Sequence, residues 1–241
     1  MMANIRLFVD HALAAGQLIP LTREQAHYLF SVMRLGVGDT VTVFNGSDGA
    51  WSCAVVEAGK KGGSLMAEAQ SAPQVTPPDV ALYFAPIKKA RTDFIVEKAA
   101  ELGVRQICPM QTDFTNSERI RQDRLQAHAV EAAEQCGGTY VPEVMALQKM
   151  STLLNGWDAA RQILFCDETL VDAQKAFPTA TQGQPWAIFI GPEGGFSEAE
   201  RDRLRALPQA HPVSLGPRVL RADTAAVAAL TLWQHHLGDW Q

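Results

Sequence analysis

Residues 186–226, WAIFIGPEGGFSEAERDRLRALPQAHPVSLGPRVLRADTAA, contain two apolar runs that each end in a glycine turn. Trp186–Ile190 has the length and the flanking proline and glycine of a strand buried on both faces. The second run, Pro212–Leu215, ends at Gly216-Pro217. Because ligands of parallel α/β sheets bind at the carboxyl ends of strands, the two turns predict one pocket lined mostly by backbone. Ordinary strand–helix connections, which use glycine for turning alone, are an alternative of about equal weight.

Helices are predicted after both turns. Ser197 and Glu200 form an S-x-x-E capping box that opens a helix ending near Leu207, and Ala222–Leu237 has the pattern of a last helix. No Gly-Lys-Ser/Thr follows the glycines, and G-x-G-x-x-G is absent from this stretch. The stretch therefore matches neither a phosphate-binding P-loop nor a dinucleotide-binding turn.

Upstream, the chain alternates strands and helices. Strand Val80–Ala85, a helix over Thr92–Leu102 and strand Arg105–Met110 form a βαβ unit, which indicates a parallel sheet. A helix over Arg124–Gln135 and a buried strand over Ile163–Cys166 follow, and Val141–Leu147 is predicted as an irregular strand.

The first 72 residues have a different character. A short strand over 5–9 precedes a capping box, Thr22-Arg23-Glu24-Gln25, and an amphipathic helix that Gly36 and Gly38 stop. Short strands follow, joined by glycine turns, which predicts a small β-barrel. Gln70–Asp79 is rich in proline and polar residues, as linkers are. The expected organisation is a barrel domain over 1–72, a linker over 73–79 and an α/β domain over 80–241.

Composition narrows the class of protein. The 241 residues are 47% hydrophobic and 20% charged, as in an ordinary globular protein. No run approaches the ~20 apolar residues of a membrane span, and the amino terminus lacks a signal-peptide pattern, so we expect a cytoplasmic protein. The four cysteines are dispersed and no H-E-x-x-H occurs, so no metal site is predicted.

The net charge of −5 argues against a protein that coats nucleic acid indiscriminately, although a local basic face is compatible with it. Three clusters are candidates for such a face, and for each one a solvated surface patch is the more common explanation: Lys60-Lys61, Lys88-Lys89-Arg91 and Arg119-Arg121-Arg124.

Two motifs, Ile190-Gly191-Pro192-Glu193-Gly194-Gly195-Phe196 and Leu215 through Ala225, resemble the ribosomal RNA methyltransferase E family of the SPOUT class. Glu131 through Gly137 adds a smaller match, so the resemblance covers nearly the whole chain. It departs at two positions: Gly138 stands where the family has arginine, and Asp223 where it has glutamate.

The resemblance implies an α/β fold: a carboxyl-terminal trefoil-knot domain with a parallel sheet, preceded by a PUA-like β-barrel. The residue pattern alone favours an open doubly wound sheet, since threaded chains are nearly absent among folds. The resemblance also implies that three knot loops bind S-adenosylmethionine, near Phe165–Glu168, Ile190–Phe196 and Leu215–Leu220. The cofactor-binding residues carried over are Ile190, Gly191, Gly195, Leu215, Gly216, Val219 and Leu220. A β-carbon on the three glycines is expected to clash with the cofactor.

The reaction implied is methylation of N3 of one uridine in 16S ribosomal RNA. A cation that stabilises the anion formed when N3 loses its proton favours the reaction. Arg221 is preferred for this role and Arg218 is the second candidate, with phosphate clamping or subunit bridging as alternatives. Asp223 either acts as a base, orients Arg218 or caps the last helix.

The substrate implied is the assembled small ribosomal subunit, bound by a homodimer. Arg34, Lys88, Arg91 and Arg124 are the expected RNA contacts, and for Arg34 a helix-end cation is an equally weighted alternative. Competing hypotheses are a ribose 2′-O methyltransferase of the same class, a non-catalytic ribosome-assembly factor and, more distantly, a nucleotide-binding metabolic enzyme.

Overall fold

The computed structural model describes residues 5–59, 62–116, 119–170 and 183–240. These residues form two compact units. One contains the chain up to Thr76 together with Ala133–Val141, and the other contains Pro77–Ala132 and Pro142–Gln241. In the described helices, no segment is long and apolar enough to cross a membrane.

The first unit is built on one sheet in the order β1-β3-β4-β5-β2. β1 pairs with β3 in parallel and the other neighbours are antiparallel. Its core is formed by aliphatic side chains such as Ile19, Val41 and Leu65, all fully buried. The strand bounds are β1 Arg6–Phe8, β2 Leu18–Pro20, β3 Thr40–Phe44, β4 Ala50–Gly59 and β5 Gly62–Ala72. The short β2 was missed in the sequence.

The predicted capping box at Thr22 and Gln25 is confirmed, and it opens α1 (Arg23–Ala26). The helix then differs from the prediction, because it continues as a π-helix over His27–Val32 and ends before Gly36. Arg34 follows it with φ 60°, a left-handed conformation that favours glycine after a helix. The helix therefore ends before the two glycines, and the left-handed residue that follows it is Arg34.

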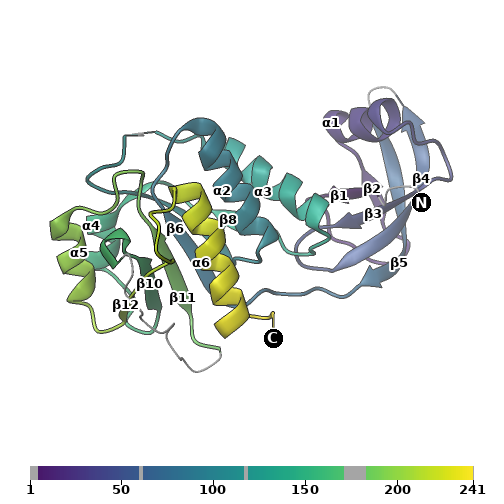
Figure 1. The fold of residues 1–241 in the computed structure, drawn as a ribbon. Helices are drawn as coiled ribbons and strands as arrows, with labels where there is room; N and C mark the ends of the chain where they lie inside the picture. The colour runs from purple at the N-terminus through teal and green to yellow at the C-terminus, as the bar shows by residue number, and fades with distance from the viewer. Residues whose placement is uncertain (1–4, 60–61, 117–118, 171–182, 241) are drawn as a thin grey trace. The chain divides into compact units, whose positions relative to one another are not determined.

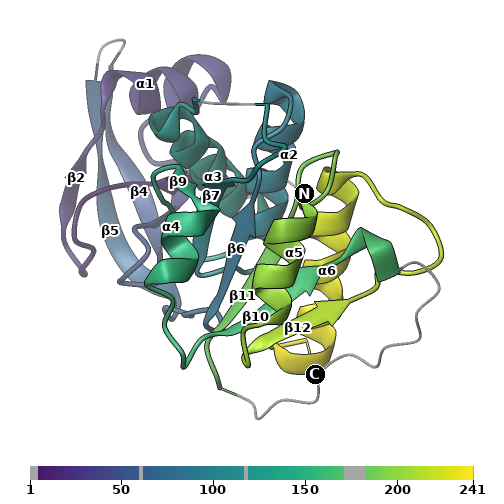
Figure 2. The same ribbon diagram turned by 90° about the vertical axis from the view of Figure 1, so that its left-hand side faces the viewer.

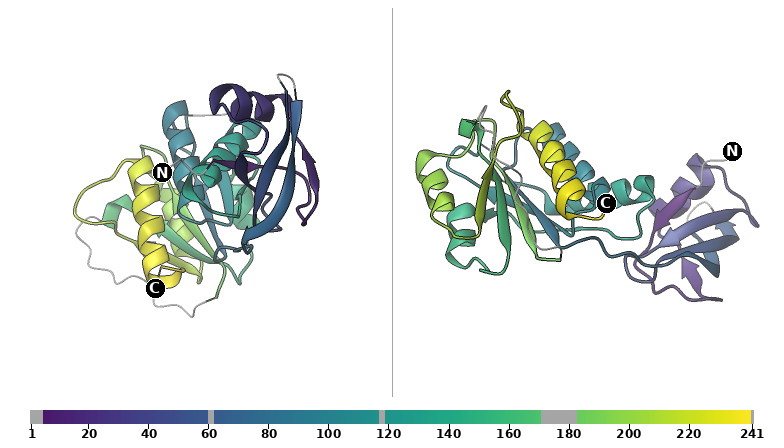
Figure 3. Two further views of the ribbon diagram at one scale, coloured as in Figure 1. Left: turned by 90° about the vertical axis from the view of Figure 1, so that its right-hand side faces the viewer. Right: turned by 60° about the horizontal axis from the view of Figure 1, so that its bottom comes forward.

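The second unit has a sheet in the order β12-β10-β11-β6-β7-β8, with β9 paired to β7, and its pairs are parallel (Figure 2). Helices α2 and α6 cover one face of this sheet, and α4 and α5 cover the other (Figures 1 and 3). The bounds are β6 Val80–Phe84, α2 Lys89–Glu101, β7 Gln106–Gln111, α3 Gln122–Cys136, β8 Glu143–Val144, β9 Gln148–Lys149, α4 Met150–Asn155, β10 Gln162–Cys166, β11 Trp186–Ile190, α5 Glu198–Arg205, β12 Ala210–Val213 and α6 Ala222–Leu237.

Two predicted elements match the structure in both bounds. Strand β11 is Trp186–Ile190, buried at every position between β10 and β6, and helix α6 is Ala222–Leu237. Two predicted strands need correction. The run expected over Pro212–Leu215 is β12 at Ala210–Val213, an edge strand where Pro212 costs no ladder hydrogen bond. Within the run expected over Val141–Leu147, only Glu143–Val144 forms a strand, β8, and the second short strand, β9, follows that run at Gln148–Lys149.

Candidate cofactor and RNA site

A pocket of about 580 Å³, open in part to solvent, lies where β10, β11 and β12 end. Three segments line it, with Ala222 and Ala225 of α6: Cys166–Glu168 after β10, Ile190–Glu193 and Gly195 after β11, and Val213–Gly216 and Arg218–Leu220 after β12. Parallel strands place their carboxyl ends at one edge of the sheet, which explains why segments so distant in the sequence meet here.

All seven residues predicted to bind the cofactor line this one pocket. The structure thus brings together Ile190, Gly191 and Gly195 from one turn with Leu215, Gly216, Val219 and Leu220 from the next. The first loop, which had the least distinctive sequence, contributes Cys166, Asp167 and Glu168. Part of the segment between β10 and β11, residues 171–182, lies outside the described residues.

The turn after β11 is closed by a hydrogen bond in which the Gly195 amide donates to the carbonyl of Pro192, at 2.9 Å. Gly195 has φ +70°, and a β-carbon there would be 2.1 Å from Oε1 of Glu168. The positive φ and the Glu168 side chain therefore favour glycine at 195 within the protein itself, in addition to the clash with the cofactor that the sequence predicts. Gly216, with φ +115°, differs: nothing lies within 4 Å of its ideal β-carbon, so that position is open to a ligand.

Two ion pairs anchor the loop after β10 to α5. Glu168 accepts from Nη1 of Arg201 at 3.1 Å, and Arg201 also donates to the carbonyl of Phe196. Asp167, whose side chain is fully buried, pairs with Nη2 of Arg205 at 2.5 Å. Burial by itself raises the pKa of Asp167, but hydrogen bonds from Thr169 and the pair with Arg205 outweigh it and lower the pKa. The carboxylate is thus a charged anchor for the loop.

Cys166 also lines the pocket. Burial, with Glu168 nearby, raises its pKa to about 12, so the neutral thiol is the form present near neutral pH. Cys166 therefore contributes polarisable surface to the pocket and no charge.

The predicted catalytic residues occupy different positions. Both arginines are exposed, but Arg218 lines the pocket, whereas Arg221 lies outside that lining and its backbone forms the N-cap of α6. Asp223 lies 3.5 Å from Nη1 of Arg91 on α2, and its Oδ1 accepts from the Thr224 amide. The carboxylate thus pairs with Arg91, a partner that the sequence interpretation did not consider.

Two of the predicted basic clusters meet in the second unit. Lys89, at the start of α2, lines a second hollow with Arg119, Arg121 and Arg124. Lys88 precedes α2 as its exposed N-cap, and Arg124 is ion-paired with Asp93 on that helix. Arg34 is exposed in the first unit, and Lys60 and Lys61 lie outside the described residues. Of the predicted RNA contacts, Lys88, Arg91 and Arg124 therefore all belong to α2 or contact it.

The chain matches two family models: an RNA methyltransferase domain over residues 75–234 and an RNA methyltransferase PUA domain over residues 21–65. It is 27% identical to the ribosomal RNA small subunit methyltransferase E of Rickettsia conorii over 93% of each chain. With the protein of the same name from Synechocystis it shares 30% identity, over 88% of this chain and 71% of the relative.

Among solved structures, a putative methyltransferase from Legionella pneumophila, in complex with bound S-adenosylmethionine, matches with a TM-score of 0.87. The two are 27% identical, and the match covers 99% of this chain and 100% of that one. These similarities confirm the predicted fold class, an α/β trefoil-knot domain preceded by a small PUA-like β-domain. The chain belongs to the RNA methyltransferase family that includes the ribosomal RNA small subunit methyltransferases E.

Proposed function

We propose that this protein transfers a methyl group from S-adenosylmethionine to N3 of one uridine in 16S ribosomal RNA. The observation that carries the proposal is the pocket in which the three loops meet, because all seven residues taken from the family motif line it. The names of the relatives support a ribosomal RNA substrate, and the complex of the Legionella pneumophila protein supports the cofactor.

The chemistry of the lining fits S-adenosylmethionine. Ile190, Leu215 and Leu220 offer apolar surface for the adenine ring, and the glycine turns expose backbone groups for its polar edge. The cofactor carries a positive sulfonium and an ammonium group, and the carboxylates of Glu168 and Glu193 place negative charge at the same pocket. When bound, the cofactor supplies the methyl group, and the protein's task is to orient the acceptor for in-line attack.

Arg218 is the better candidate for stabilising the uridine anion, because it lines the pocket whereas Arg221 lies outside that lining. The N3 proton leaves before or during attack, and a guanidinium beside the base offsets the resulting negative charge. Asp223 acts through Arg91, whose guanidinium it holds near the start of α6. In this scheme Arg221 contacts a phosphate of the RNA.

The basic residues around the start of α2 form the RNA-binding face. Lys88 supplies positive charge, and Arg91 and Arg124, each paired with an aspartate, are partly exposed donors for phosphate. Because the net charge of the chain is −5, binding depends on local donors and on RNA shape. Arg34 adds a phosphate contact from the first unit. We further propose that the protein acts in the cytoplasm as a homodimer on the assembled small subunit.

The test is incubation with methyl-labelled S-adenosylmethionine and small ribosomal subunits that lack the modification, followed by mass spectrometry of the nucleosides. We expect 3-methyluridine at one site, and a loss of about 100-fold or more in kcat for Arg218→Ala. Arg203→Ala is the matched control and keeps wild-type kcat, because the guanidinium of Arg203 on α5 donates to Ser151 and Asn155 of α4 and is not part of the pocket lining. Label on a ribose replaces the proposed reaction by 2′-O methylation, and failure to bind cofactor favours an assembly factor.

A further inference from the structure

The side chain of Phe114 is 49% exposed although the loop that carries it is firmly held. This loop follows β7 at the carboxyl edge of the sheet. Oε1 of Glu200 accepts from the Asp113 amide at 2.9 Å, and Ser197 donates to Oδ2 of Asp113 at 2.6 Å. The hydroxyls of Thr112 and Thr115 close the loop at 2.8 Å. The exposure of the ring is therefore imposed by a fixed backbone.

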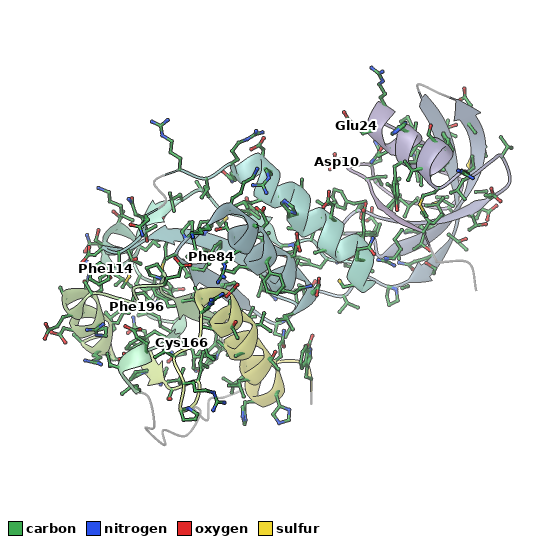
Figure 4. The ribbon with its side chains drawn as sticks, turned by 45° about the horizontal axis from the view of Figure 1, so that its top comes forward. Asp10, Glu24, Phe84, Phe114, Cys166 and Phe196 are labelled. Atoms are coloured by element: carbon green, nitrogen blue, oxygen red, sulfur yellow. The ribbon has the colours of Figure 1, made fainter. Side chains whose placement is uncertain are left out.

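The ring lies against the turn that forms one wall of the cofactor pocket. A β-carbon on Gly194 would be 3.4 Å from Cβ of Phe114 and 3.6 Å from Cδ2. The neighbours of Gly194 in the chain, Glu193 and Gly195, both line the pocket. Figure 4 shows Phe114 and Phe196 beside α5.

Glu200 ties Phe114 to this wall. Its Oε2 accepts from the Ser197 amide at 2.9 Å in the capping box of α5, while Oε1 accepts from the Asp113 amide.

Gly194 does not have a positive φ, so its backbone conformation does not require glycine. A β-carbon at 194 would be in van der Waals contact with Phe114, so the ring packs directly against this glycine.

N3 of uracil lies on the Watson–Crick edge, so the base must be unpaired and unstacked before it accepts a methyl group. A base removed from its stack gains most from a new aromatic surface. We propose that Phe114 is the positioning residue on which this uracil stacks as it reaches the pocket. The proposal rests on the proposed function, since it requires an RNA base as the methyl acceptor.

The experiment compares Phe114→Leu, which keeps apolar volume but removes the aromatic face, with Phe114→Tyr and Phe114→Trp, which retain one. We expect Phe114→Leu to lower kcat/KM for unmodified small subunits by roughly 5- to 150-fold, the range measured for base–aromatic stacking. Both aromatic variants stay within about threefold of wild type. Binding of S-adenosylmethionine, measured by calorimetry, stays unchanged in all three.

Phe94→Leu is the matched control, because Phe94 is 39% exposed but lies on α2, where Lys98 is over its ring at 5.4 Å. This variant keeps wild-type kcat/KM. A Phe114→Leu enzyme with wild-type kcat/KM overturns the stacking proposal. A change in the sedimentation coefficient of Phe114→Leu would also overturn it, because such a change would show that a second copy of the chain covers the Phe114 ring.

A separate readout distinguishes the two proposals. Phe114→Trp adds a fluorophore whose emission, after subtraction of the wild-type signal, is quenched when a base stacks on it. If the wild-type enzyme methylates no uridine, the proposed function fails on that result alone. Quenching by unmodified subunits then still supports stacking of an RNA base on this residue, and unchanged emission refutes it.

Discussion

The carboxylate of Asp223, in the first turn of α6, lies 3.5 Å from the guanidinium of Arg91, in the first turn of α2. If Asp223 positions Arg91, the two residues act as one unit. We expect Asp223→Ala and Arg91→Ala each to lower kcat/KM about tenfold, and the double variant to be no worse than either. The pair is partly exposed, so the free energy of unfolding falls by at most about 1 kcal/mol.

The measurement is a double-mutant cycle on methyl transfer, with the pH profile of kcat/KM for each variant. Effects that multiply would indicate independent roles. Loss of the acidic limb of the profile in Asp223→Asn would instead make Asp223 a general base.

The open space beside Gly216 predicts a specific loss of cofactor binding in Gly216→Ala. The new methyl group faces space that the protein leaves empty, so we expect about tenfold or more weaker binding of S-adenosylmethionine by calorimetry. Gly38→Ala is the control, because Gly38 also has positive φ and no atom near its β-carbon, but lies in the first unit. Both variants lose about 1 to 2 kcal/mol of stability. Equal cofactor affinities in the two would remove Gly216 from the site.

Asp167 predicts a pH-dependent contribution to stability. Its pKa is lowered in the folded protein, so its stabilisation is present above the unfolded value of 3.8 and is lost as the pH falls through the lower folded value. Asp167→Asn is expected to cost about 2 kcal/mol in urea unfolding at pH 7, and the cost shrinks below pH 4. Asp202→Asn is the control. Asp202 is exposed, and its distance of 3.8 Å from the same arginine, Arg205, is longer than that of Asp167. A cost independent of pH would show that packing, not charge, is responsible.

Cysteine reactivity is predicted to be confined to one site. Burial raises the pKa of Cys53 and Cys166 to about 12 and that of Cys108 to about 11, whereas Cys136 is exposed. At pH 8, iodoacetamide should therefore modify Cys136 rapidly and the other three slowly, as followed by peptide mass spectrometry. Cys136→Ser should abolish the rapid phase. Rapid modification of Cys166 would contradict the burial of its thiol.

Elements with strong local signals were predicted well from the sequence. Trp186–Ile190 is a continuous apolar run between proline and glycine, and Ser197 with Glu200 forms the capping box that begins α5. Residues adjacent in the sequence are enough to define both elements. By contrast, β2 consists of three residues with one buried side chain, Ile19, and it exists because it pairs with β5. A pattern of three residues carries too little periodicity to reveal it.

The pocket, too, was predictable only where its signals are local in the sequence. Its glycine turns were visible in the sequence, but the contacts that shape it join residues distant along the chain. Glu168 beside Gly195, Arg205 on Asp167 and Phe114 on Gly194 all depend on which strands are neighbours. The order β10-β11-β6-β7 is set by long-range pairing, which residue spacing does not encode.

Helix α3 spans Gln122–Cys136, and its last turn belongs to the same compact unit as β1. There the carbonyl of Gly138 accepts from Nη2 of Arg6 at 2.6 Å, and Glu134 accepts from the Phe8 amide at 2.8 Å. Thr139 accepts from the Val75 amide at 3.0 Å. A gene fragment ending before residue 77 would encode the β-strands without these partners. A single crossover between related genes at this point would therefore separate residues that fold together. The architecture favours inheritance of the β-domain together with the whole α3 segment.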